Sequence, residues 1–151
     1  MSSGIWVLIA ALVLAPAFGL WRAARDGRFR GTHRVRADAP APDGPPDLAD
    51  EPLPLAGLDH QPGERATLLQ FSSAFCAPCR ATRRILAEVA TIVPGVVHVE
   101  VDAEHHLDVV RRLGIVRTPT TLLLDSTGRE VSRASGAPRQ EQVLATLAEL
   151  T

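Results

Sequence analysis

An uncharged apolar run near the N-terminus limits how this chain can fold. Residues 4–21 read GIWVLIAALVLAPAFGLW and contain no charged side chain. As a helix rising about 1.5 Å per residue, this run reaches about 27 Å, close to the roughly 30 Å hydrocarbon core of a bilayer. Trp6 and Trp21 stand near its two ends, where indole rings favour the headgroup region. We therefore predict a transmembrane anchor over residues 1–21.

A cleavable signal peptide and a buried helix of a soluble protein are the alternatives for this run. Ala15-Pro16-Ala17 has the small-x-small pattern of a cleavage site, but residues 1–4 lack the Lys or Arg of a signal peptide. Basic residues follow the run instead, namely Arg22, Arg25, Arg28, Arg30, Arg34 and Arg36. Because basic residues flank a span on its cytoplasmic side, we predict a single-pass protein of the cell membrane whose domain is cytoplasmic.

The segment behind the anchor has the composition of a linker. Residues 22–52 begin with the arginine block and continue into a stretch rich in Pro, Ala and Asp that lacks a sustained apolar period. Extended at about 3.1 Å per residue, such a stretch could hold a domain tens of ångströms from the membrane. We predict a juxtamembrane segment and linker over residues 22–52, and one folded domain over residues 53–151. Near its start, Leu53, Leu55 and Leu58 are expected to form a short edge strand or a packed loop.

The charge of the chain argues against nucleic-acid binding. Its formal net charge is -1 at pH 7, and the basic excess lies in one short block beside the apolar run. Domains that bind DNA or RNA carry a basic face and a markedly positive charge. We therefore expect no nucleic acid among the partners.

The apolar pattern of the domain predicts alternating strands and helices. Strands are expected over residues 67–71, 96–101, 120–124 and 130–134, the last two joined as a hairpin by residues 125–128. Helices are expected from the cysteines to Val93, over residues 104–113, and along the apolar positions from Val143 to Leu150. The resulting order βαβαββα is that of an α/β domain.

Two cysteines, Cys76 and Cys79, enclose Ala77 and Pro78 at the start of the first helix of this domain. Unpaired N–H groups and the positive end of the helix dipole lower the pKa of a cysteine there from about 8.5 toward 7 or below. Pro78 suits a first helical turn, where its missing N–H has no partner to lose. We expect Cys76 to attack a disulfide as the nucleophile and Cys79 to resolve the mixed disulfide.

A zinc site and a permanent structural disulfide are the alternatives for this pair. Zinc would need two further ligands, and the five histidines of the chain show no matching spacing. A disulfide that encloses so few residues restrains the unfolded chain little. We therefore expect no metal, and no cofactor other than a redox-active disulfide between Cys76 and Cys79.

The strand, the Cys-Ala-Pro-Cys motif at a helix start and Thr118-Pro119 before a later apolar strand together resemble the thioredoxin superfamily. The resemblance covers roughly residues 53–151. It implies a thioredoxin fold, with a mixed central sheet flanked by helices, behind one transmembrane helix. It also implies that Pro119 is cis and packs beside the active site, so that the Thr118 backbone is free to pair with a substrate chain.

The motif departs from the superfamily pattern at several positions. Phe75 and Ala77 stand where a tryptophan and a glycine are common, and with Pro78 they are expected to support the active site. Gln70 takes the place of a buried acid, and His98 aligns with the lysine that often faces that acid. These replacements put the usual proton relay in doubt. We expect His98 to be an outward or core-edge strand residue rather than a substitute base.

The resemblance implies a thiol–disulfide oxidoreductase, foremost a protein-disulfide reductase near the membrane. Its partners would be protein disulfide substrates and an electron-donating reductase or membrane thiol carrier. Two alternatives remain open. One is an extracytoplasmic thioredoxin-like protein of cytochrome maturation or disulfide metabolism, which topology would reveal. The other is a non-catalytic tethered binding module that uses the Thr118-Pro119 surface and does not need its cysteines.

Overall fold

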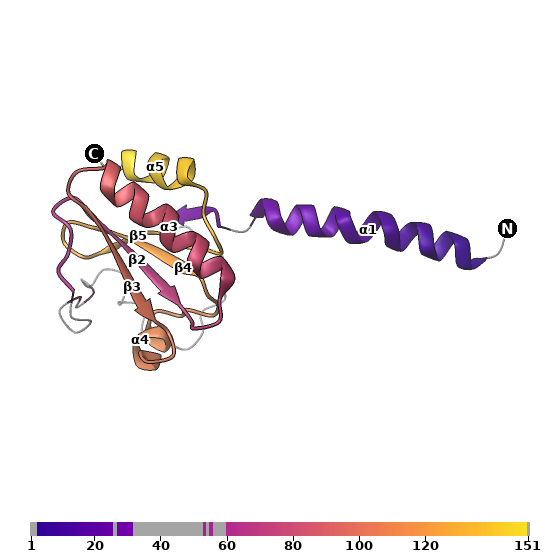
Figure 1. Cartoon of the computed structure of the whole chain (residues 1–151), viewed down its shortest axis with the longest axis horizontal. Helices are drawn as coiled ribbons and strands as arrows, with labels where there is room; N and C mark the ends of the chain where they lie inside the picture. The colour runs from indigo at the N-terminus through magenta and orange to yellow at the C-terminus, as the bar shows by residue number, and fades with distance from the viewer. Residues whose placement is uncertain (1–2, 26, 32–52, 54, 56–59, 151) are drawn as a thin grey trace.

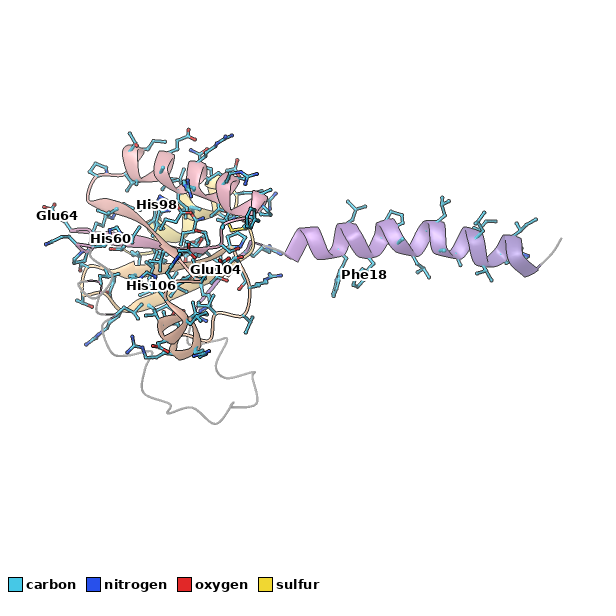
Figure 2. The ribbon with its side chains drawn as sticks, turned by 60° about the horizontal axis from the view of Figure 1, so that its bottom comes forward. Phe18, His60, Glu64, His98, Glu104 and His106 are labelled. Carbon is cyan, nitrogen blue, oxygen red and sulfur yellow. A yellow bond between two sulfur atoms is a disulfide. The ribbon has the colours of Figure 1, made fainter. Side chains whose placement is uncertain are left out.

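A computed structural model describes residues 3–25, 27–31, 53, 55 and 60–150 of the chain. Helix α1 (Ser3–Arg25) extends away from the folded domain (Figure 1). Its stretch Gly4–Trp21 is long and apolar enough to cross a membrane, and none of it is buried. Phe18 projects outward from this helix (Figure 2). The chain therefore has one N-terminal helix that could span a bilayer.

A mixed five-stranded sheet in the order β1-β5-β4-β2-β3 forms the centre of the domain. The strands are β1 (Phe29–Gly31), β2 (Ala66–Ser72), β3 (Val96–Asp102), β4 (Thr120–Asp125) and β5 (Glu130–Ser135). Strands β2 and β3 are parallel, and the other neighbouring pairs are antiparallel. Every residue of β2 is buried, as expected for a central strand with both faces covered.

Helices cover the two faces of the sheet (Figure 1). On one face, α3 (Ala77–Ile92) and α5 (Gln140–Ala148) pack over a core that includes Leu68, Leu86 and Leu123. On the other face, residues of α4 (Leu107–Arg112) pack against a second core that includes Phe71 and Leu122. Since neighbouring side chains of a strand point to opposite faces, the apolar runs of β2 and β4 supply both cores at once.

The element order of the domain matches the prediction, apart from an additional strand at its start and a shorter second helix. The helix predicted over residues 104–113 begins only at Leu107. The Asp102 side chain accepts a hydrogen bond from the Glu104 N–H at 2.8 Å, and His106 bonds the Asp102 carbonyl at 3.0 Å. These bonds hold residues 103–106 in a turn, because an Asp side chain competes with the helix for backbone groups.

Strand β1 was not predicted, and it lies in the segment that the sequence pattern assigned to the linker. It pairs antiparallel with β5, so that Phe29 faces Ala134 and Gly31 faces Ser132. Gly27 just before it donates its N–H to the Ser135 carbonyl at 2.8 Å. Only three residues separate α1 from β1. The prediction that a linker holds the domain tens of ångströms from the anchor is therefore wrong.

Gly27 makes this close attachment possible. Its φ of 73° lies in the region that glycine adopts most readily. A Cβ atom at this position would come within 2.0 Å of the Ala137 carbonyl oxygen. A side chain here would therefore push the N-terminal segment off the edge of the sheet.

The leucines before β2 form a packed loop, which was one of the two predicted possibilities. Leu53 donates its N–H to the Gly128 carbonyl at 3.0 Å, and Leu55 is buried in the core on the α4 side. Leu58 and most of the predicted linker, residues 32–52, lie outside the described residues. The folded domain thus contains residues that precede residues 32–52 and residues that follow them.

Candidate active site

The cysteine motif lies where β2 gives way to α3. Cys76 is the N-cap of α3, with an extended backbone, and Ala77 and Pro78 occupy the first turn. The Cys79 N–H donates to the Cys76 sulfur at 3.1 Å. The positive end of the helix and one of its free N–H groups are therefore directed at Cys76, as the sequence predicts.

The two cysteines form a disulfide, and they differ in exposure. Cys76 is half-buried, whereas the Cys79 residue is only 2% exposed. A partner can thus approach Cys76 from outside the domain, while Cys79 is accessible chiefly from within the domain. This asymmetry matches the roles expected of an attacking and a resolving cysteine.

The Thr118-Pro119 segment lies against the cysteine loop, and its peptide bond is cis, as the resemblance implies. The hydroxyl groups of Ser73 and Thr118 are 3.1 Å apart and share a hydrogen bond. Pro119 is buried, and its carbonyl accepts the Gly136 N–H at 2.8 Å. The structure therefore brings together the two motifs that are far apart in the sequence.

Two exposed apolar side chains belong to these loops. Phe75, immediately before Cys76, is 100% exposed, and Val116, shortly before Thr118, is 91% exposed. Sequence reasoning identified Phe75 but missed Val116, whose only signal is its position before Thr118-Pro119. Exposed apolar groups beside a reactive centre are a common feature of protein-contact surfaces.

Next to the disulfide, the buried Gln70 makes polar contacts with Cys79 and His98. The Gln70 side chain is completely buried and donates to the Cys79 carbonyl at 3.0 Å. Its amide oxygen lies 3.1 Å from Nε2 of His98. His98, which belongs to β3 (Figure 2), is half-buried at the core edge as predicted, and it contacts the residue beneath Cys79.

Burial of this contact favours a neutral His98. Burial lowers the pKa of His98; the nearby Glu100 opposes this change, and Arg83 adds to it. Burial raises the pKa of Glu100, but hydrogen bonds from Arg83 and Ser72 outweigh it and leave that pKa below its usual value. Glu100 therefore stays ionised and bonded to the Ser72 hydroxyl at 2.6 Å at the end of β2.

The folded domain is similar in sequence to known proteins. A thioredoxin family model matches residues 59–149. Thioredoxin H-type 1 of Nicotiana tabacum is 30% identical over 78 residues, which cover 52% of this chain and 61% of that protein. A thioredoxin of Alicyclobacillus acidocaldarius subsp. acidocaldarius is 32% identical over 89 residues, covering 58% of this chain and 84% of that protein.

Solved structures agree on the fold. The X-ray structure of Fasciola hepatica thioredoxin superposes with a TM-score of 0.54 at 24% identity, covering 64% of this chain and 91% of that one. The chain spans about three fifths of the length of the tobacco protein and of a rice thioredoxin. The family match includes the cysteine pair, the Thr118-Pro119 loop and every strand from β2 to β5. The chain belongs to the thioredoxin family.

Proposed function

We propose that this domain is a thiol–disulfide oxidoreductase that reduces protein disulfides through Cys76 and Cys79. The observation that carries the proposal is the different exposure of the two sulfur-bearing residues at the start of α3. Cys76 is accessible at the helix N-terminus, and Cys79 is buried one turn further on. A structural disulfide has no need of this arrangement, whereas an exchange reaction uses both parts of it.

The reaction begins with both cysteines reduced. The helix N-terminus and the Cys79 N–H stabilise the Cys76 thiolate, which attacks one sulfur of a substrate disulfide. The substrate's other sulfur leaves as a thiolate and takes a proton, so a mixed disulfide joins Cys76 to the substrate. Cys79 then loses its proton and attacks the Cys76 sulfur. The substrate leaves with two thiols, and Cys76 and Cys79 have lost two electrons.

The neighbouring residues have supporting roles in this proposal. The Thr118 backbone, beside Pro119, pairs with the substrate chain, and Phe75 supplies an apolar contact next to Cys76. Ala77 and Pro78 shape the first turn. The disulfide is the only redox group that the reaction requires, and each cycle needs an electron-donating reductase or a membrane thiol carrier to restore the dithiol.

The membrane placement is a further part of the proposal. Helix α1 spans the bilayer, and the arginines after it keep the domain on the cytoplasmic side. A membrane-impermeant maleimide tests this placement in mildly reduced cells. Labelling of Cys76 and Cys79 only after permeabilisation supports a cytoplasmic domain, and labelling in intact cells refutes it.

A trapping experiment tests the chemistry. The full chain carrying Cys79→Ser, in detergent and reduced beforehand, is mixed with insulin and quenched with acid. We expect a mixed disulfide to accumulate through Cys76, because the resolving thiol is absent. The variant Cys76→Ser should form none, and Ala74→Ser, an exposed neighbour, should behave as the wild type. Equal trapping by Cys76→Ser and Cys79→Ser would refute the assigned roles.

A further inference from the structure

The anchor enters the domain at the same end of the sheet as the cysteine motif. In the β1–β5 pair, Phe29 faces Ala134, next to the last residue of β5. Ser135 in turn faces Thr120, the first residue of β4, and Thr120 faces Phe71, next to the last residue of β2. Three features therefore lie at the same end of the strands, along one edge of the domain (Figure 1). They are the junction with α1, the Thr118-Pro119 loop and the start of α3.

The distances along this edge are short. Strand spacing is about 4.8 Å, so three steps from β1 to β2 separate the anchor junction from the cysteine end of β2 by about 15 Å. Three residues between α1 and β1 span at most about 11 Å when fully extended. The Gly27 N–H bond to the Ser135 carbonyl holds that connection to the sheet. The connection therefore keeps this edge of the domain close to the anchor.

The exposed apolar side chains of the site are at this same edge. Phe75 and Val116 belong to the loops at the active-site end. Ile92, by contrast, ends α3 at the opposite end of the helix, about 24 Å away at 1.5 Å per residue. A protein in solution would have to enter between the bilayer and the domain to reach Cys76. A protein already embedded in the bilayer meets no such obstacle.

We propose that the redox partner of Cys76 and Cys79 is a pair of cysteines in an integral membrane protein, placed at the water–lipid boundary on the same side as the domain. This inference rests on the proposed oxidoreductase function and specifies its substrate. In the exchange, the partner's disulfide takes up two electrons and two protons and becomes a dithiol. Cys76 and Cys79 give up the same electrons and protons and close their disulfide. Strand β1 restricts the site to partners within the membrane plane.

A fluorescence measurement tests the placement alone. The full chain with Trp6→Phe and Trp21→Phe is reconstituted into vesicles whose lipids carry a nitroxide on the headgroup. A single tryptophan is then introduced by Phe75→Trp or, as the matched control, by Ile92→Trp; both positions are exposed, at 100% and 55%. We expect strong quenching for Phe75→Trp and weak quenching for Ile92→Trp. Equal quenching, or the reverse order, overturns the inference.

An insertion experiment tests the consequence for substrate choice. Ten Gly/Ser residues inserted directly after Arg25 separate the domain from the anchor. The same ten residues inserted within residues 32–52, behind β1, lengthen the chain but leave the attachment of the domain unchanged. Two disulfide probes are compared in vesicles, namely insulin in solution and a single-span peptide with a disulfide-linked pair of cysteines beside its membrane end.

We expect the insertion after Arg25 to lower the rate for the peptide several-fold, because the effective concentration of the site at the membrane falls, and to raise the rate for insulin. The control insertion should change neither rate. Unchanged rates after both insertions, with both probes reduced, overturn the inference and leave the oxidoreductase function standing. A parent chain that reduces neither insulin nor the peptide contradicts the proposed function itself.

Discussion

Replacing Gln70 by glutamate converts a buried amide into an ionisable group of nearly the same shape. The amide now donates to the Cys79 carbonyl and lies against His98. A protonated carboxyl can preserve the first bond through its O–H, whereas a carboxylate can only accept and would face the carbonyl oxygen without a proton between them. Burial and this contact both raise the pKa of the introduced carboxyl in the folded state.

The expected cost follows from proton linkage. The carboxyl has a higher pKa in the folded protein than in the unfolded chain, where the pKa of glutamate is about 4.3. Below that unfolded pKa the variant loses no stability, and as the pH rises toward the pKa of the folded state its stability falls. At 1.36 kcal/mol per pKa unit, keeping the carboxyl protonated up to pH 7 costs at most about 3.7 kcal/mol. His98 can offset part of this by becoming protonated beside the carboxylate. We therefore expect Gln70→Glu to cost about 2 to 3 kcal/mol at pH 7 and under about 1 kcal/mol at pH 4.5.

Urea unfolding of the oxidised full chain in detergent, followed by circular dichroism, measures this difference. The matched control is Gln61→Glu, the same chemical change at an exposed position. It should alter the free energy of unfolding by less than about 0.5 kcal/mol at both pH values. The deciding quantity is the difference in free energy of unfolding between Gln70→Glu and the wild type. If this difference is the same at pH 4.5 and at pH 7, the buried contact described for Gln70 is refuted.

Three further predictions follow from the same contacts. Because burial lowers the pKa of His98, the folded domain binds fewer protons than the unfolded chain below about pH 6.5. The free energy of unfolding should thus fall between pH 7.5 and 5.5, and His98→Gln should flatten that slope; an unchanged slope in the same urea titration contradicts this. Leu123 is fully buried between α3, α5 and the sheet, so Leu123→Ala should cost about 2 to 5 kcal/mol, against no more than about 1 for the exposed Val116→Ala. Both tryptophans lie in α1, so reduction of the Cys76–Cys79 disulfide should leave the tryptophan emission of the wild-type chain unchanged; a clear change contradicts the placement of both tryptophans outside the folded domain.

Local patterns were sufficient to predict the elements that position the site. The apolar run of β2, the spacing of Leu86 and Val89 on α3 and the turn between β4 and β5 each depend on residues close in sequence. The cysteines and Thr118-Pro119 could be assigned to one site only through the family resemblance. Their contact, a hydrogen bond between Ser73 and Thr118, joins loops separated by a helix, a strand and a second helix.

Other features depend on distant pairing and could not be predicted. Strand β1 has three residues and no alternating pattern, and it exists because β5 offers an open edge about one hundred residues later. The Gln70–His98 contact depends on the register of β2 against β3, in which His98 faces Leu68 rather than Gln70. The late start of α4 depends on the Asp102 side chain, which holds Glu104 in a turn.

A single-turnover measurement tests the central claim that Cys76 and Cys79 act together as a redox pair. The reduced full chain is mixed with excess insulin, without any reductant, and both the insulin thiols and the Cys76–Cys79 disulfide are counted by alkylation and mass spectrometry. We predict one insulin disulfide reduced for each disulfide closed in the chain, and none with Cys76→Ser. Cysteines that stay reduced while insulin remains intact would contradict the account.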